Sequence, residues 1–335
     1  MKDIAHDLGV SVVTVSKVLR NSPEIGAETR ARVLSRMKEL DYQPNQAARS
    51  LATGRAWMMG LIVPDLVHPF FSQVAKGASR IFRERGYGLV ISSSEQDPEL
   101  EKQEIRQMLG RRLDVLLVAS TQAVDDSFRR IDEQKKHYVL IDRNFAGLEA
   151  NFVGTDDRAV GRAAVEHLIQ NGYRKIAHLG GCGVSTAIGR LQGYQQALDE
   201  AGLKAPPQYI HSRAKVDDEG DVTGYEGMRV LLDLKPRPDA VFCYNDPIAM
   251  GAMEAVLGAG LSVPRDVAII GCGNVKYARM LRVPLSSVDQ NSEILGQQAA
   301  SLALELAGTK NASPARTILL APNVIGREST ISSRR

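Results

Sequence analysis

The hydrophobic pattern of the chain changes near residue 58. Up to Tyr42, apolar side chains recur at helical spacings in three short segments, and no stretch alternates as a strand would. Turn signals at Gly9 and in SPEIG separate the segments. The pattern predicts a small all-α head with three short helices. Its expected core residues are Ile4, Ala5, Leu8, Val10, Val15, Val18, Leu19, Val33, Leu34, Met37 and Leu40.

From Met58 onward, short β-rich runs alternate with amphipathic helical stretches. This alternation is typical of parallel sheets joined by crossover helices. Because the series restarts near KIAHLGG, it predicts an α/β body of two doubly wound parallel-sheet subdomains. Ligands of such sheets lie beyond the carboxyl ends of the strands. The expected strands and their ends are MMGLIVPDL, GLVISSS, VLLVAS, YVLID, NFVGTDD, KIAHLGG, AVFCYND, VAIIGCG and SSVDQ.

These patterns divide the chain into a head, a linker and a body. The linker QPNQAARSLATGRAW has the residues of a short helix between Pro44 and Gly54. We expect each subdomain of the body to combine two separate stretches of the chain. The expected bounds are 1–43 for the head, 44–57 for the linker and 58–335 for the body, whose subdomains combine 58–155 with 290–317 and 156–289 with 318–330.

The second helical segment, residues 12–20, has two faces. On a helix Val15, Val18 and Leu19 fall on one side, whereas Val12, Val13, Ser16, Lys17 and Arg20 turn outward. With the preceding helix and the turn at Gly9, this segment can form a helix-turn-helix whose outward residues reach base edges in a major groove. By spacing alone, a plain three-helix bundle with a solvated surface fits equally well.

Charge and cysteine content narrow the partners and the compartment. The first 57 residues hold nine Lys and Arg against six Asp and Glu, and the rest of the 335-residue chain is balanced. The basic head points to a polyanionic partner. The three cysteines have neither the spacing of a zinc site nor that of a disulfide framework, so we expect buried thiols in a cytoplasmic protein, with no metal. No apolar stretch is long enough to cross a membrane.

Catalytic motifs are weak. GGCGVSTAIGR has glycines but lacks the Gly-Lys-Ser/Thr of a phosphate-binding loop, and neither GxSxG nor HExxH occurs. Acids at strand ends more often hydrogen-bond loops or ligand hydroxyls than transfer protons. We therefore expect no enzymatic activity and no cofactor. The acids concerned are Asp142, Asp156, Asp157, Asp246 and Asp289.

The run DIAHDLGVSVVTVSKVLRNSPEIGAETRARVLSRMKELDYQPNQAARSLATG resembles the DNA-binding head and hinge of the lactose/galactose repressor (LacI/GalR) family. GLIVPDLVHPFF, GRLQGY, YNDPIAMGAM, SSVDQ and GREST follow in the order of that family. The resemblance implies a homodimeric transcriptional regulator that binds a pseudo-palindromic operator. It also implies a body similar to the periplasmic sugar-binding fold, which closes on a small effector such as a sugar, a sugar derivative or a nucleoside.

Site residues follow from the same resemblance. It implies that Arg190 anchors the effector and that Leu51 of the hinge helix enters the minor groove, although Leu51 could instead be an apolar plug between head and body. Base readers would be Val12, Val13, Ser16 and Lys17; phosphate contacts Thr14, Thr29, Tyr42 and Asn45; hinge contacts Ala48 and Leu51. Effector contacts would be Phe70, Phe71, Asp142, Arg190, Asn245 and Asp246, with only one of the two adjacent phenylalanines expected to point inward.

Two departures from the family pattern bear on the effector. Gly273 and Asn274 stand where many sugar-sensing relatives have an acidic pair, and the position where relatives often place a second stacking aromatic falls near Glu219. A phosphorylated or acidic sugar, a nucleoside or an atypical saccharide thus stays open. A separate departure concerns DNA: Lys17 of the head stands where arginine is usual, which loses bidentate recognition of guanine. Two rival functions stay open as well: a small-molecule binding protein with a vestigial head, and a sugar-processing enzyme.

Overall fold

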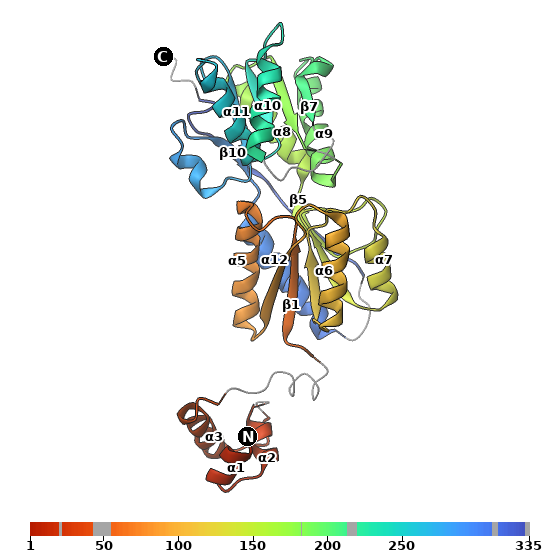
Figure 1. The fold of residues 1–335 in the computed structure, drawn as a ribbon, viewed down its shortest axis with the longest axis vertical. Coiled ribbons are helices and arrows are strands. Elements are labelled where there is room, and N and C mark those ends of the chain that lie inside the picture. Colours follow the sequence, from red (N-terminus) through yellow and green to blue (C-terminus); the bar gives the residue numbers. More distant parts are fainter. Residues whose placement is uncertain (20–21, 43–54, 182, 213–219, 310–313, 332–335) are drawn as a thin grey trace. The chain divides into compact units, whose positions relative to one another are not determined.

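The computed structural model describes residues 1–19, 22–42, 55–181, 183–212, 220–309 and 314–331 (Figure 1). The chain forms two compact units, Met1–Ala56 and Trp57–Arg335. The first is the head and the second is the body. None of the described helices is long and apolar enough to cross a membrane.

The head consists of three helices around a small core. They are α1 (Lys2–Asp7), α2 (Val12–Leu19) and α3 (Ala27–Glu39). Ile4, Ala5, Val15, Val18 and Val33 are buried together. Two predicted core residues were wrong: Leu34 and Leu40 are 49% and 42% exposed, because α3 buries only one face.

Polar contacts fix the ends of these helices. The Ser11 hydroxyl accepts a hydrogen bond from the backbone N–H of Thr14 (3.0 Å), which caps the start of α2. Gly9 has φ +63°, a conformation that glycine adopts without strain, and it makes the turn between α1 and α2. Arg36 of α3 pairs with Asp7 of α1 (2.6 Å), so the first and third helices are tied together.

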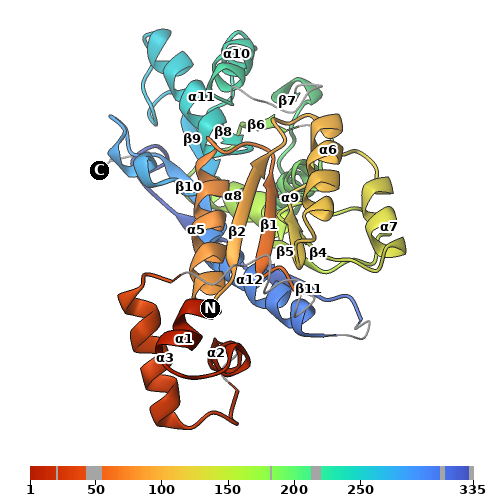
Figure 2. The same ribbon diagram turned by 60° about the horizontal axis from the view of Figure 1, so that its bottom comes forward.

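Each half of the body is a six-stranded sheet with helices on both faces, as predicted. In the first sheet all pairs are parallel, in the order β11-β5-β4-β3-β1-β2. Helices α5 and α12 share a core on one face, where Figure 2 shows them side by side, and α6 and α7 cover the other. The strands are β1 (Met58–Val63), β2 (Gly88–Ser93), β3 (Val115–Val118), β4 (His137–Ile141), β5 (Phe152–Thr155) and β11 (Thr317–Leu320); the helices are α5 (Pro69–Glu84), α6 (Pro98–Gly110), α7 (Asp126–Glu133) and α12 (Ser292–Gly308).

The second sheet repeats this arrangement in the order β12-β10-β9-β8-β6-β7, with β12 antiparallel at one edge. Helices α8 and α9 cover one face, and α10 and α11 cover the other. The strands are β6 (Ile176–Gly180), β7 (Ile210–Ser212), β8 (Ala240–Cys243), β9 (Ala268–Cys272), β10 (Ser286–Asp289) and β12 (Asn323–Ile325); the helices are α8 (Asp157–Gln170), α9 (Ser185–Glu200), α10 (Gly220–Leu232) and α11 (Asp246–Gly258).

The chain crosses between the two sheets three times, after β5, β10 and β11. The crossings are bonded to one another: the Asp156 N–H donates to the Leu320 carbonyl (3.3 Å), and the Asn291 amide donates to the Ala321 carbonyl (3.2 Å). The last crossing follows Leu320 rather than residue 317, because β11 pairs along its whole length with β5. Three connecting segments, joined by hydrogen bonds, therefore link the two subdomains.

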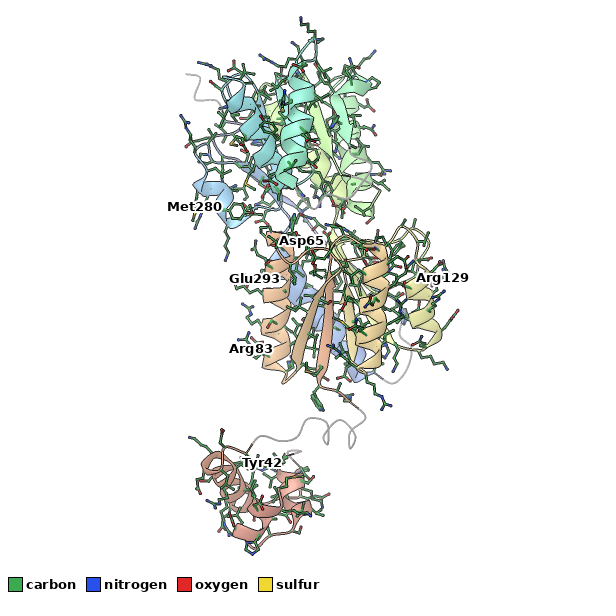
Figure 3. The ribbon with its side chains drawn as sticks, viewed as in Figure 1. Tyr42, Asp65, Arg83, Arg129, Met280 and Glu293 are labelled. Carbon is green, nitrogen blue, oxygen red and sulfur yellow. The ribbon has the colours of Figure 1, made fainter. Side chains whose placement is uncertain are left out.

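Glycine pairs bring helices into close contact in both subdomains. A methyl group at Gly161 of α8 would overlap the Arg190 carbonyl oxygen of α9, and one at Gly193 of α9 would overlap the Arg158 carbonyl oxygen of α8. The pairs α5–α12 and α10–α11 use glycines in the same way. At the start of α12, Glu293 (Figure 3) pairs with Lys76 of α5 (2.9 Å). The backbones of paired helices are thus in contact.

Candidate functional site

The exposed end of α2 is the first candidate site. Val12 and Val13 are 39% and 64% exposed, whereas Val15 and Val18 are buried. Ser16 and Lys17 are half-buried on the outer side. The two faces predicted from spacing are therefore present in the structure. Exposed apolar side chains at a helix start suit contacts with thymine methyl groups.

The expected phosphate contacts differ in their surroundings. The Thr14 hydroxyl is hydrogen-bonded to Ser11 (2.9 Å), so both hydroxyls lie at the positive end of the α2 dipole. Thr29 is half-buried in the first turn of α3, and Tyr42 packs partly against the head core. Asn45, Ala48 and Leu51 lie outside the described residues.

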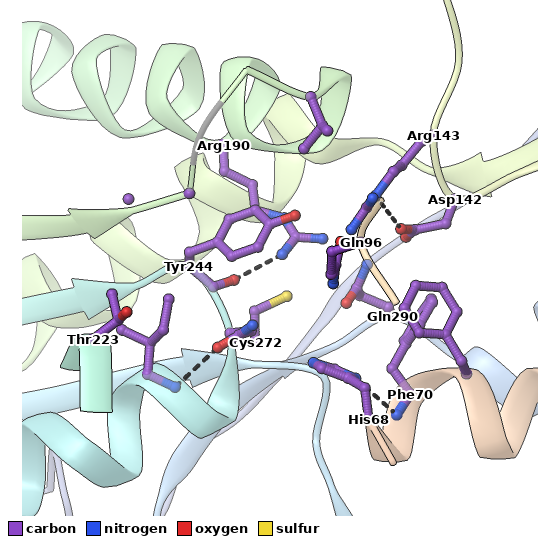
Figure 4. Close-up of a pocket in the computed structure, with 16 residues that line it drawn as sticks. His68, Phe70, Gln96, Asp142, Arg143, Arg190, Thr223, Tyr244, Cys272 and Gln290 are labelled. Atoms are coloured by element: carbon purple, nitrogen blue, oxygen red, sulfur yellow. Dashed lines mark hydrogen bonds and ion pairs between the residues drawn. The ribbon is translucent and has the colours of Figure 1, made fainter. Parts of the chain in front are cut away.

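The second candidate site is a pocket between the two sheets of the body (Figure 4). The pocket lies beyond the carboxyl ends of strands from both subdomains. Its volume is about 60 Å³, which is room for several water-sized groups. A wider cleft of about 520 Å³ adjoins it and shares Arg143 and Val184. The pocket is lined by His68, Phe70, Phe71, Gln96, Asp142, Arg143, Gly180, Gly181, Val184, Arg190, Thr223, Tyr244, Asn245, Ile248, Cys272 and Gln290.

Arg190 extends from α9 into this pocket and is held on three sides. Its Nε donates to Asp157 (2.9 Å), its Nη1 donates to the Tyr244 carbonyl (2.7 Å), and its guanidinium lies 4.6 Å from the Tyr244 ring centre. Burial raises the pKa of Asp157 to about 6, against the opposing effect of Arg190. The guanidinium is thus fixed in one orientation.

Asp142 and Arg143 come from the turn after β4. Asp142 has φ 61°, in the left-handed region, and its carboxylate accepts no hydrogen bond from any described residue. Burial raises its pKa, although Arg143 and Arg190 oppose that shift. The Arg143 Nη1 donates to the Ser120 carbonyl (3.2 Å). A buried carboxylate, Glu101 of α6, holds the loop by accepting from Ser120 Oγ (2.6 Å).

Phe70 and Phe71 are both among the residues that line the pocket, and both are buried. Their rings meet edge to face with centres 5.1 Å apart, and this lets the two adjacent side chains share one wall. His68 precedes them and caps α5 by accepting from the Phe70 N–H (3.3 Å). Burial lowers the pKa of His68 to about 4, and Arg143 and Arg190 add to that shift.

Four buried polar atoms of the pocket have no hydrogen-bond partner within the described residues. They belong to two amides, one guanidinium and one hydroxyl: Gln96 Oε1, Gln290 Nε2, Arg143 Nε and Thr223 Oγ1. Buried polar groups without partners are costly, and native proteins leave few of them. A ligand that offers both donors and acceptors would satisfy this set.

Asp246 does not line the pocket, which corrects its expected role as an effector contact. It is fully buried, and its carboxylate accepts from the Val275 N–H (2.8 Å) and from the Ser287 hydroxyl (2.6 Å). Burial raises its pKa to about 6. Asp246 therefore ties together loops of the second sheet, while Asn245 caps α11 by accepting from the Ile248 N–H (2.9 Å) and also faces the pocket.

Gly273 and Asn274 also lie outside the pocket lining. The Asn274 amide donates to Asp289 (2.9 Å), and its oxygen accepts from Arg327 (2.6 Å). Arg327 belongs to the GREST segment, which thus closes the second subdomain. These two positions supply no carboxylate to a ligand.

Six lining residues with amide, guanidinium, hydroxyl or imidazole side chains were not among the predicted effector contacts. Gln96, Arg143 and Gln290 stand just after strands, so their position was a usable signal. Thr223 lies inside α10, and only the fold shows that it faces the pocket. His68 lies two residues before Phe70, and its ring packs against the rings of Phe70 and Phe71. Tyr244 directly precedes Asn245, and its ring packs against the Arg190 guanidinium.

A helix-turn-helix head followed by a two-lobed α/β body defines a class of DNA-binding regulators. Residues 1–45 match the family described as bacterial regulatory proteins, lacI family, and residues 165–330 match the periplasmic binding protein-like domain. The chain is 34% identical to the HTH-type transcriptional regulator GalR of Escherichia coli (strain K12), across 98% of this chain and 95% of that protein.

Solved structures agree with this match. The transcriptional regulator CelR in complex with cellobiose is 28% identical, with a TM-score of 0.75, over 97% of this chain and 98% of that one. The lac repressor dimer bound to operator and an anti-inducer shares the fold, with 24% identity and a TM-score of 0.84 over 98% of each chain. The chain belongs to the lacI family of bacterial regulatory proteins. It is a DNA-binding transcriptional regulator and not an enzyme.

Proposed function

We propose that the protein is an effector-responsive repressor of carbohydrate-related genes that binds a pseudo-palindromic operator as a homodimer. The exposed tip of α2 carries the proposal, because Val12 and Val13 are available to a partner while the inner face of the same helix is buried. The buried thiols of Cys243 and Cys272 suit a reducing compartment, and we propose a cytoplasmic location.

In the proposed complex, α2 enters the major groove of each half-site. Val12 and Val13 contact thymine methyl groups, and Ser16 and Lys17 donate to base edges. Thr14, Thr29, Tyr42 and Asn45 bind phosphates and so set the register of the helix. Ala48 and Leu51 of the hinge segment enter the minor groove, where Leu51 unstacks a base step.

The effector that this pocket suits is a neutral, hydroxyl-rich small molecule of the saccharide class. The two arginines of the pocket each have a neighbouring carboxylate, Asp157 for Arg190 and Asp142 for Arg143. The pocket therefore has little net positive charge with which to bind a phosphate. Hydroxyl groups donate and accept, as the partnerless atoms of Gln96, Arg143, Thr223 and Gln290 require. The aromatic wall suits the apolar face of a sugar ring. The complex of the related CelR with cellobiose agrees in class.

Switching in this proposal uses the three crossings. The residues that line the pocket come from both subdomains. A bound ligand therefore favours the angle between the two subdomains at which it makes the most contacts. A change of that angle alters how the two hinge segments of a dimer meet the operator. Allosteric couplings of this kind are typically about 1–3 kcal/mol.

The proposal can be tested by selecting duplexes from a random library with the full-length protein. We expect selective binding whose affinity falls steeply with salt, because Lys and Arg release counterions from phosphates. Thermal-shift measurements with neutral saccharides, sugar acids, sugar phosphates and nucleosides should give stabilisation by a neutral saccharide. A ligand response without any sequence-selective DNA binding would instead support the small-molecule binding protein.

A further inference from the structure

Lys17, a proposed base reader, is not a free cation in the head. Its ammonium group forms an ion pair with the carboxylate of Glu24, which lies seven residues further along the chain. Glu24 belongs to the turn between α2 and α3. The Lys17 side chain is 44% exposed and the Glu24 side chain is 66% exposed, so the pair is on the surface of the head.

The backbone of the turn holds Glu24 beside α2. The Ser22 N–H donates to the Lys17 carbonyl (3.0 Å), and Arg30 Nη2 of α3 donates to the Ser22 carbonyl (2.6 Å). Ile25, the neighbour of Glu24, packs against the head core. The carboxylate is therefore attached to a turn fixed on both sides, and forming the pair costs less conformational entropy than it would for two free side chains.

One other acidic residue of the head, Asp7, has a structural use that Glu24 lacks. Asp7 pairs with Arg36 and joins α1 to α3, whereas Glu39 pairs with Arg36 within α3. Glu24 joins no helices, and it places a negative charge next to a residue proposed to contact a polyanion. General electrostatics disfavours a carboxylate there, so its presence calls for a specific partner.

The major groove offers such a partner. Lysine donates to guanine O6 and N7, and a glutamate carboxylate accepts from cytosine N4. A Lys–Glu pair thus matches the edges of one G·C base pair. We propose that Glu24 is a specificity-determining residue that reads a single G·C pair together with Lys17. The proposal rests on the proposed function, because it takes α2 as the reading helix.

The test compares Glu24→Gln with Glu28→Gln in the full-length protein. Glu28 is an exposed acid in the first turn of α3 and forms no ion pair with a described residue, so its variant makes the same charge change. Affinities are measured by fluorescence anisotropy for every single-base-pair variant of the selected half-site. We expect Glu24→Gln to lose about tenfold in discrimination at one G·C pair. We expect Glu28→Gln to change all duplexes by a similar factor.

A double-mutant cycle with Lys17→Met completes the test. If the two residues read one base pair, Lys17→Met affects the same pair, and the double variant loses less than the product of the single losses. A uniform effect of Glu24→Gln, or losses that multiply, would overturn the proposal. Failure of the proposed function looks different, because the wild-type protein would then show no selective binding. Circular dichroism checks that each variant folds.

Discussion

Arg190 is a buried cation whose orientation is set before any ligand arrives. Asp157, the Tyr244 carbonyl and the Tyr244 ring hold its guanidinium at the pocket wall. Because this arrangement occupies two of its nitrogens and one face, the side chain cannot swing away from the pocket. A lysine would keep the charge and lose the fork of donors.

We expect Arg190→Ala to abolish the effector response, and Arg190→Lys to weaken effector affinity at least tenfold, as is typical for loss of a charged hydrogen bond. Calorimetry with the ligand found by thermal shift, and operator release measured by anisotropy, check this. Arg158→Ala is the control, because Arg158 is exposed on α8 and bonds only to Gln192 among the described residues. An unchanged response in Arg190→Ala would remove this residue from the site.

His178 is a buried neutral side chain of the second sheet. It stacks between Tyr194 and Phe242, and its Nδ1 bonds to the Phe242 carbonyl (2.9 Å). Burial lowers its pKa to about 4 from an ordinary 6.5. As pH falls, the imidazole takes up a proton near pH 6.5 in the unfolded chain but only near pH 4 in the folded chain. The free energy of unfolding therefore decreases as pH falls from about 6.5 to about 4.

The expected loss between pH 8 and pH 5 is about 2 kcal/mol of the free energy of unfolding. Other groups titrate in the same range, among them Asp157 and Asp246 with the opposite sign. Urea unfolding of the wild type and of His178→Phe at several pH values isolates the histidine. The free energy of unfolding of the wild type relative to the variant should fall by about 2 kcal/mol between pH 8 and pH 5, and parallel curves would contradict a neutral His178.

At the scale of elements, close helix contacts set the positions of site residues. Gly161 of α8 meets the Arg190 carbonyl of α9, so the depth of this contact determines where Arg190 stands. In the same way, Gly224 of α10 and Gly251 of α11 bring these two helices into contact. Each helix supplies a residue of the pocket lining, Thr223 from α10 and Ile248 from α11. Small residues here serve the site without touching it.

We expect Gly161→Ala to lower the free energy of unfolding by about 1–3 kcal/mol, because the added methyl group overlaps backbone that cannot move freely. The displaced Arg190 should also weaken the effector response. Gly110→Ala is the matched control: it ends α6, nothing lies within 4 Å of an added methyl group, and alanine favours helices. Equal stabilities of the two variants would show that α8 and α9 can separate without cost.

The elements also show what could be predicted from sequence. Alternating β-rich and helical segments predicted the two sheets, because strands buried on both faces are apolar throughout. The short edge strands β7, β11 and β12 were missed, since three or four partly exposed residues carry little periodicity. The family resemblance located Arg190 and Asn245 in the pocket. It misplaced Asp246, whose carboxylate is used by a loop that only the fold brings close.

At the scale of the whole molecule, two binding events must act through one chain. The proposed DNA contacts belong to the head and hinge, and the proposed effector contacts belong to the body. The proposed hinge contacts, Ala48 and Leu51, lie outside the described residues, and the proposed effector contacts line a pocket of the body. Operator affinity and effector affinity should therefore be separable by mutation.

We expect Leu51→Ala to weaken operator binding at least tenfold and to leave effector affinity unchanged, because the wedge in the minor groove is lost. Anisotropy on the selected operator and calorimetry on the effector measure the two affinities. Leu319→Ala is the control, as Leu319 is an exposed leucine of the body. Unchanged operator binding by Leu51→Ala would favour a merely structural role for the hinge leucine.

The three crossings have a further consequence for how the protein is made. Helix α12 fills the core of the first sheet, and β11 and β12 complete the first and second sheets, although all three come from residues 292–325. A ribosome therefore releases almost the entire polypeptide before either lobe can close. Until then apolar sheet faces and an open edge are bare, a condition that favours aggregation and chaperone capture. A frameshift near the 3′ end of the gene would thus prevent both lobes from folding.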